Sequence, residues 1–154
     1  MPKQITNYEK QVIDKFEEIA HKYNFDVLKG QGINNRIPLS GNTYFQFGDL
    51  RVETKTHHII IEVESGGGVT NLAKYWYAIE NKLQSIEKPI ILMHIYKQSS
   101  KYDFGSHLEL WDFLWEHMRK SLGNRMKATR YTYCELRELE PIIKEFENHL
   151  KAIL

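Results

Sequence analysis

The sequence predicts one α/β domain over residues 1–154, with a mixed central sheet that is flanked by helices. Two strand-like stretches, residues 43–64 and 89–96, are separated by a helical pattern at residues 70–83. Further helical patterns lie near both ends of the chain. A helix between a strand pair and a later buried strand favours a right-handed crossover, with helices on both faces of the sheet.

The outer helices are predicted from apolar residues that recur every three or four positions. A capping-box pair, Thr6 and Glu9, predicts the start of the first helix, which should end near residue 24. Residues 29–42 are rich in glycine and asparagine, so they are expected to form a loop. The last helix is predicted over residues 139–153.

The strands are predicted from alternating and continuous apolar patterns. Within residues 43–64, Gly48 is expected to mark a bend, and the run HIIIEVE at residues 58–64 is the most strand-like segment. Residues 89–96 are apolar almost throughout, which is typical of a strand that is buried on both faces. Residues 129–134 are expected to form a further strand.

Two helices are expected in the middle of the chain. The first covers residues 70–83, and Asn71 is expected to cap its first turn. A second capping box, Ser106 and Glu109, predicts the start of the next helix, and Gly123 should end it.

The composition is that of an ordinary globular protein, with 42% hydrophobic and 27% charged residues. A single cysteine, Cys134, excludes an internal disulfide and any zinc site with several cysteines. No apolar run approaches the roughly 18 residues that a membrane span needs. The first ten residues also lack the apolar stretch of a secretory signal. These features predict a cytoplasmic protein without a membrane partner.

Three carboxylates are expected to meet at one edge of the sheet. Glu62 and Glu64 are two residues apart on a predicted strand, so their side chains share one face. A turn near residues 55–57 would bring Asp49, on the preceding strand, beside them. Such acids repel unless a cation neutralises them or one stays protonated, and their hard oxygens suit Mg²⁺ or Mn²⁺. The alternative is that both glutamates lie on the solvated face of an amphipathic strand.

The same residues carry a family resemblance. Gly48-Asp49-Leu50-Arg51-Val52, a short turn and Ile60-Ile61-Glu62-Val63-Glu64-Ser65 before a helix resemble the core of the PD-(D/E)XK, or restriction-endonuclease-like, nuclease superfamily. The resemblance covers about residues 7–96 and implies an αβββαβ core. It also implies that Asp49 and Glu62 bind Mg²⁺ or Mn²⁺ as a cofactor.

The chain departs from the motif of this superfamily at two positions. Gly48 replaces the proline that usually precedes the first acid, and Glu64 stands where the lysine belongs. Some restriction enzymes of the superfamily have Glu there, and in other members the next helix supplies the lysine, as Lys74 would here. The resemblance therefore implies that the catalytic residues are Asp49, Glu62, Glu64 and Lys74. If neither substitute works, the domain binds without cutting.

A basic stretch is the candidate nucleic-acid contact. Between His117 and Tyr133 there are five cations and no acid, namely Arg119, Lys120, Arg125, Lys127 and Arg130. Such a stretch can follow a phosphate backbone, and the alternative is a solvated helix end and loop. His94, inside an apolar strand, is expected to be a hydrogen-bonded core histidine. The resemblance also offers Glu17 or Glu18 on the first helix as a further acid for the site, and the alternative is that both are simply exposed.

The leading hypothesis is a metal-dependent endodeoxyribonuclease, a hydrolase that cuts phosphodiester bonds in DNA, of a restriction or repair type. A chain of this size is expected to act as a homodimer, because cutting both strands of a duplex is simplest with two sites. The alternative is a catalytically degenerate nuclease fold that binds nucleic acid or a protein partner. A third hypothesis is a structural α/β domain whose acids are surface residues.

Overall fold

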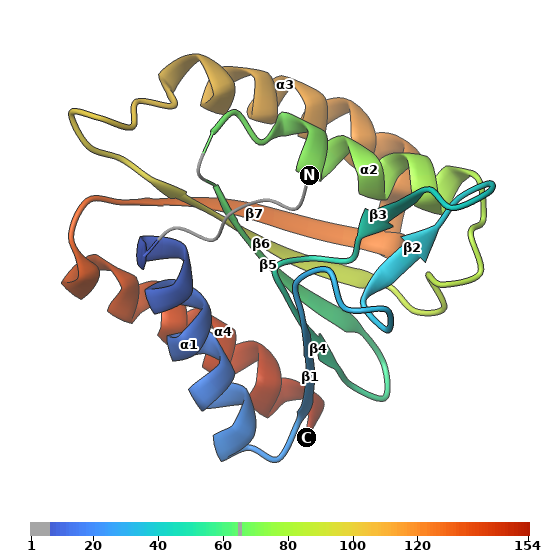
Figure 1. The fold of residues 1–154 in the computed structure, drawn as a ribbon, viewed down its shortest axis with the longest axis horizontal. Helices are drawn as coiled ribbons and strands as arrows, with labels where there is room; N and C mark the ends of the chain where they lie inside the picture. Colours follow the sequence, from blue (N-terminus) through green and yellow to red (C-terminus); the bar gives the residue numbers. More distant parts are fainter. Residues whose placement is uncertain (1–6, 65) are drawn as a thin grey trace.

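A computed structural model describes residues 7–64 and 66–154 and shows, within them, a mixed five-stranded sheet between two pairs of helices (Figure 1). The elements follow one another as α1 (Asn7–Lys22), β1 (Asp26–Lys29), β2 (Arg36–Pro38), β3 (Tyr44–Gln46), β4 (Leu50–Glu53), β5 (His58–Glu64), α2 (Val69–Glu80), β6 (Ile90–Lys97), α3 (Gly105–Leu122), η1 (Gly123–Arg125), β7 (Met126–Tyr133), η2 (Leu136–Glu138) and α4 (Leu139–Ile153). The predicted α/β class with a mixed sheet is therefore confirmed.

The strand order of the main sheet is β1-β4-β5-β6-β7. The first three of these strands pair antiparallel, whereas β5, β6 and β7 pair parallel. Each parallel connection runs through a helix, α2 or α3. The short hairpin of β2 and β3 forms a separate sheet and comes between β1 and β4 in the chain.

Strand β5 lies at the centre of the sheet, and every one of its residues is buried. Ile59, Ile61 and Val63 face the core formed with α1 and α4, and Ile60 faces the core formed with α2 and α3. A strand that is covered on both faces needs apolar residues at nearly every position, as this run has. Glu62 is an exception, because it is a carboxylate that points into a covered face.

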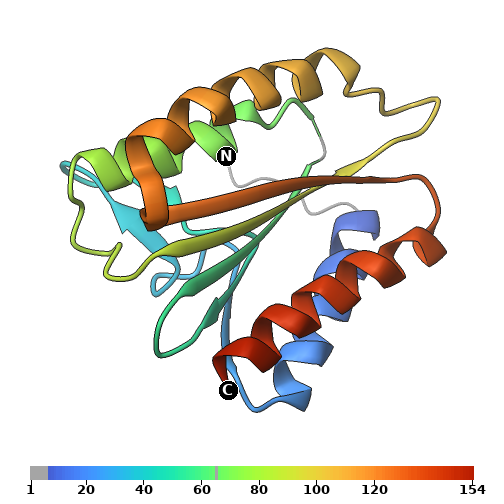
Figure 2. The same ribbon diagram turned by 180° about the vertical axis from the view of Figure 1, so that it is seen from behind.

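The two helical layers are visible on opposite sides of the sheet in Figures 1 and 2. Helices α1 and α4 lie side by side, and the rings of Phe16 and Phe146 meet edge to face at 5.0 Å between their centroids. Helices α2 and α3 cover the other face through residues such as Leu72 and Trp111. The parallel connections account for α2 and α3 on one face, whereas α1, before the first strand, and α4, after the last, cover the other.

Most predicted elements agree with the structure to within a few residues. The last helix has the predicted bounds, and the expected strands near Gly48 and residues 58–64 are observed. The loop prediction over residues 29–42 was wrong in part, because β2 lies within it and pairs with β3. Strand β2 has three residues, of which only Ile37 is buried, and this is too short for an alternating apolar pattern to be recognised in the sequence.

The predicted caps agree less well. Thr6, of the first capping box, lies outside the described residues. The second capping box is not formed, since α3 begins after Phe104 without a side-chain cap, and the Gly105 N–H instead donates to Asp103 at 3.0 Å. Gly123 ends α3 as predicted, with a positive φ of 56°.

Among the helices of the described part of the chain, none is both long enough and apolar enough to cross a lipid bilayer.

Candidate functional site

The register of β4 and β5 places Asp49 level with Glu62. Leu50 pairs with Ile61, and the Asp49 N–H donates to the Ile61 carbonyl at 3.1 Å, one residue beyond that pair. The expected approach of these two acids across an antiparallel pair is therefore observed.

The Asp49 carboxylate is fixed by two hydrogen bonds. Its Oδ2 accepts from the Val63 backbone N–H at 2.8 Å, and its Oδ1 accepts from the Gln46 side-chain amide at 2.9 Å. Gly48, which precedes it, has a φ of +89°, a value that proline cannot adopt. A Cβ at this position would also lie 2.5 Å from Ile60 Cγ2. The backbone therefore explains why glycine stands where the motif has proline.

Glu62 is buried, with an exposed fraction of 1%. Lys74 Nζ from α2 lies 3.4 Å from its Oε1 and 3.3 Å from its Oε2. The Tyr75 hydroxyl lies 3.5 Å from Oε1. Glu64 is also buried, at 2% exposed. The alternative in which both glutamates lie on a solvated strand face is therefore excluded.

Burial raises the pKa of Glu62 to about 8. The nearby charge of Lys74 opposes this shift, whereas the negative charges of Asp49 and Glu64 add to it. Lys74 lies within ion-pair distance, yet its attraction does not outweigh the loss of hydration. A pKa of about 8 means that the Glu62 carboxyl is mainly protonated at pH 7.

Glu64 is held by other partners. Its Oε1 lies 2.5 Å from His94 Nε2 on β6 and accepts from the Asn71 side-chain amide at 2.7 Å. Within residues 7–64 and 66–154, no three His, Cys, Asp or Glu side chains are grouped to hold a metal ion. The expected meeting of three carboxylates in one group is thus not observed, and the candidate ligands are the pair Asp49 and Glu62.

Gly68 allows Glu64 to take this position. A Cβ on Gly68 would lie 2.1 Å from the Glu64 carboxyl carbon, and the residue has a φ of +93°. Gly68 is also the N-cap of α2, so the prediction that Asn71 caps this helix was wrong. Asn71 instead uses its amide to bind Glu64, whose negative charge is favoured at a helix N-terminus.

Lys74 of α2 contacts both Asn71 and Glu62. It lies three residues after Asn71 on α2, and its Nζ is 3.4 Å from the Asn71 Oδ1 as well as within reach of Glu62. Residues three apart on a helix share one face, which brings both side chains to the acids of β5. Its exposed fraction is 8%, so Lys74 is a buried residue of α2 and not one that faces solvent.

The basic stretch lies largely at the other end of the sheet. Lys127 pairs with Ile91, whose partner on β5 is Ile59, three residues before Glu62. At about 3.3 Å per residue and 4.8 Å per strand, this separates the two backbones by roughly 14 Å. Arg119, Lys120 and Arg125, near the C-terminal end of α3, share this end of the sheet. These residues therefore do not form a phosphate-binding strip beside the carboxylates.

The arginines of this stretch already have acidic partners. Arg119 contacts Glu116 through four hydrogen bonds of 2.6–2.9 Å, and Arg130 contacts Asp112 at 2.7 and 2.8 Å. Only Arg130 is level with Glu62, through His94 on the strand between them. Contact of the five cations with DNA stays a prediction.

Two features of α1 were not expected from the sequence. The Tyr8 hydroxyl of α1 donates to the Glu64 backbone carbonyl at 2.6 Å. Glu9 is 1% exposed, whereas Glu17 makes a peripheral ion pair with Lys29 at 3.0 Å. The buried acid of α1 is thus Glu9, and its place in a capping-box pattern hid it. His94 is a hydrogen-bonded core residue, as predicted.

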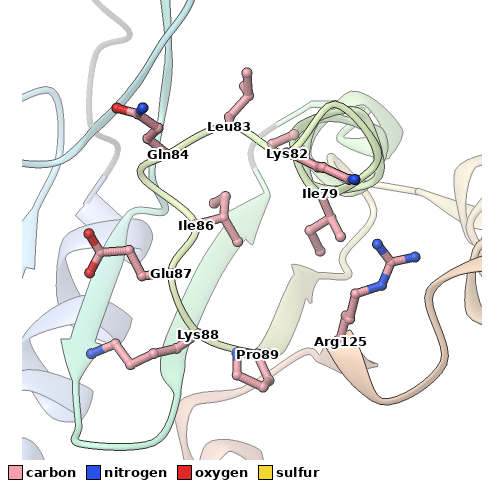
Figure 3. A pocket seen from close by; sticks show the side chains of 10 residues that line it. Ile79, Lys82, Leu83, Gln84, Ile86, Glu87, Lys88, Pro89 and Arg125 are labelled. Carbon is pink, nitrogen blue, oxygen red and sulfur yellow. The ribbon is translucent and has the colours of Figure 1, made fainter.

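A pocket of about 360 Å³ lies at the other end of α2 from the carboxylates. Figure 3 shows its lining around the segment that joins α2 to β6, with Lys82, Glu87, Lys88 and Arg125 among the side chains. Lys88 is engaged there, because it donates to Glu53 at 2.6 Å. This pocket has no part in the arrangement of Asp49 and Glu62.

Comparisons of the chain with protein-family models, with curated proteins and with solved structures found no match. Function is therefore inferred from the residues and their geometry.

Proposed function

We propose that the protein is a metal-dependent endodeoxyribonuclease that hydrolyses phosphodiester bonds in DNA. One observation carries the proposal: Asp49 and Glu62 lie level on adjacent strands, and Lys74 Nζ is 3.3 Å from Glu62. Two acids and a lysine in this relation are the set that the nuclease motif implies, with the lysine supplied from the helix.

The order of the elements supports the same proposal. Between α1 and α2, the main sheet receives β1, β4 and β5, and after α2 it receives β6, parallel to β5. This is the order α, three β, α, β that a restriction-endonuclease-like core would have. The hairpin of β2 and β3 is then an insertion between the first two of these strands.

The chemistry of Asp49 and Glu62 fits a divalent cation. Both offer hard carboxylate oxygens, which suit Mg²⁺ or Mn²⁺. The raised pKa of Glu62 comes from burial and from neighbouring acids, and a bound cation would relieve both causes. When bound, such an ion polarises a phosphoryl oxygen and lowers the pKa of a coordinated water. Because Glu62 must lose its proton to serve as a ligand, binding is expected to release a proton.

The other side chains act on the substrate phosphate. In the proposed reaction Lys74 donates a charge-assisted hydrogen bond to the scissile phosphate or orients the attacking water. Glu64 assists indirectly: it accepts a hydrogen bond from Asn71, and Asn71 in turn contacts Lys74. Two copies of the chain would supply one site for each DNA strand, which is the reason to propose a homodimer.

A second candidate function is DNA or protein binding without catalysis. It is favoured by the pairing of Lys74 with Glu62, because a lysine at 3.3 Å already supplies one positive charge to the acids. The absence of a strand lysine beside Glu62 points the same way. In this case the carboxylates would be a structural remnant, and metal ions would not affect function.

Cleavage of supercoiled plasmid DNA with Mg²⁺ or Mn²⁺ separates the two candidates. The proposal predicts metal-dependent nicking that is lost in Asp49→Asn and Glu62→Gln. Asp14→Asn is the matched control, since Asp14 is an exposed acid of α1 that pairs with Lys10. DNA binding in EDTA that weakens with salt, without nicking by a folded protein, would favour the second candidate.

A further inference from the structure

A chain of hydrogen bonds connects Lys74 to the core beneath α3. His94 is completely buried on β6, where its backbone pairs with Glu62 of β5 while its side chain reaches Glu64. Its Nδ1 accepts from the Trp111 indole N–H at 2.8 Å, and its Nε2 lies 2.5 Å from Glu64 Oε1. Apolar packing alone would not require a histidine here, because a buried polar ring needs a hydrogen-bond partner for each nitrogen. Both ring nitrogens of His94 have one.

The contacts with Trp111 and Glu64 allow His94 only one tautomer. An indole nitrogen can only donate, so His94 Nδ1 must be the accepting nitrogen of the ring. The ring hydrogen is therefore on Nε2, and it is donated to Glu64. Trp111 thus fixes the tautomer of His94, and His94 orients the carboxylate of Glu64.

The next two links transmit this orientation to Lys74. Glu64 Oε1 accepts from the Asn71 amide nitrogen at 2.7 Å. With its nitrogen committed to Glu64, the Asn71 amide must present its oxygen elsewhere, and Oδ1 lies 3.4 Å from Lys74 Nζ. The Lys74 ammonium is thereby held between Asn71 and Glu62.

We propose that Trp111 and His94 are positioning residues for Lys74, and that they act through Glu64 and Asn71. This assigns a role to the glutamate in the lysine position of the motif: it is the acceptor that turns Asn71 toward Lys74. The catalytic consequence rests on the proposed nuclease function, whereas the position of the ammonium does not. Misplacement of a catalytic group by about 1 Å is enough to lower a rate by about 100-fold.

Kinetic variants separate this role from simple core packing. His94→Leu removes both hydrogen bonds and is expected to lower kcat by about 100-fold, whereas His94→Gln keeps a donor and an acceptor and is expected to retain most activity. In a Lys74→Ala background, His94→Leu should cause no further loss, because its effect passes through Lys74. An equal loss in both backgrounds would overturn the proposal.

A second pair of variants tests the start of the chain. Trp111→Phe removes the indole N–H and is expected to lower kcat by about tenfold with an unchanged Mn²⁺ affinity. Trp115→Phe is the matched control, because the Trp115 ring lies 6.2 Å from that of Trp111 on the same helix. Equal effects of the two variants would overturn the proposal.

NMR of the lysine ammonium groups decides the structural part without any cleavage assay. The Lys74 signal, assigned by its loss in Lys74→Ala, should shift in His94→Leu and Trp111→Phe but not in Trp115→Phe. A shift in a protein that never cuts DNA would support the positioning chain and reject the nuclease function. An unchanged Lys74 signal in His94→Leu would overturn the positioning chain, whether or not the protein cuts.

Discussion

Replacement of Glu62 by glutamine tests whether burial keeps this carboxyl protonated. Glutamine has nearly the same size and keeps an oxygen that can accept from Lys74, but it cannot ionise. It therefore imitates the protonated form that a pKa of about 8 implies at neutral pH. The variant and the wild type should differ mainly where the wild type is forced to ionise.

The expected size of the effect follows from the difference between the usual pKa of 4.5 and the value of about 8 in the folded protein. At about 1.4 kcal/mol per pH unit, this difference corresponds to at most about 5 kcal/mol. Between pH 4.5 and 8 the folded chain retains a proton that the unfolded chain has lost. The free energy of unfolding therefore falls as the pH rises through this window, and the full loss is reached above pH 8.

Urea unfolding at pH 5, 7 and 9 measures this effect for both proteins. The two should be nearly equally stable at pH 5, and Glu62→Gln should be the more stable one at pH 9 by several kcal/mol. The attraction of Lys74 for an ionised Glu62 is already contained in the pKa of about 8. A stability difference that does not change from pH 5 to pH 9 would show that Glu62 is ionised throughout and that burial does not raise its pKa.

Three further substitutions have expected outcomes in urea unfolding. Gly68→Ala should lower the free energy of unfolding by about 3 kcal/mol, because its Cβ would meet the carboxyl of Glu64 at a positive φ. Gly30→Ala, also at a positive φ but with no atom within 4 Å of its Cβ, should lower it by only about 1 kcal/mol. Equal losses in the two variants would contradict this explanation. Burial raises the pKa of Glu53, but the hydrogen bonds it receives outweigh burial and lower the pKa to about 2, so this group stabilises the fold above pH 4.5 and the benefit is lost as the pH falls toward 2. The free energy of unfolding of Glu53→Gln should therefore fall less between pH 4.5 and pH 2 than that of the wild type. An equal fall in both proteins would contradict the lowered pKa of Glu53. Phe16→Ala should cost about 4 kcal/mol, because it empties the core between α1 and α4, and a loss below 1 kcal/mol would contradict that packing.

The sequence was sufficient to predict the helices and the strands β4 to β7, because periodicity is a local signal, but the edge strand β1 was not predicted. Residues 58–64 and 89–96 are apolar at nearly every position, and both are buried strands at the centre of the sheet. The helices of residues 139–153 and 105–122 show the same agreement. Strand β2 was missed because three residues do not establish a period.

The relation of Asp49 to Glu62 was also predictable, because it depends only on the register of one hairpin. The orientation of Glu64 was not. Two glutamates on one face of a strand look equivalent in the sequence, and what separates them is His94, which reaches Glu64 from a strand 30 residues further along the chain. Long-range pairing of this kind leaves no local pattern.

The basic stretch shows the opposite limit of sequence reasoning. Five cations without an acid look like one surface when they are read along the chain. Folding distributes them over α3, η1 and β7, and it brings Asp112 to Arg130 from a different element. Charge along the chain indicates charge on a surface only where neighbouring elements do not supply counterions.

A crystal structure of the protein soaked with Mn²⁺, with anomalous scattering used to locate the ion, tests directly whether Asp49 and Glu62 bind a metal. We expect a peak about 2.1 Å from carboxylate oxygens of both Asp49 and Glu62, with the Lys74 ammonium displaced from its present position 3.3 Å from Glu62. No peak at these carboxylates at millimolar Mn²⁺, with Lys74 still paired to Glu62, would contradict the claim that they form a metal site.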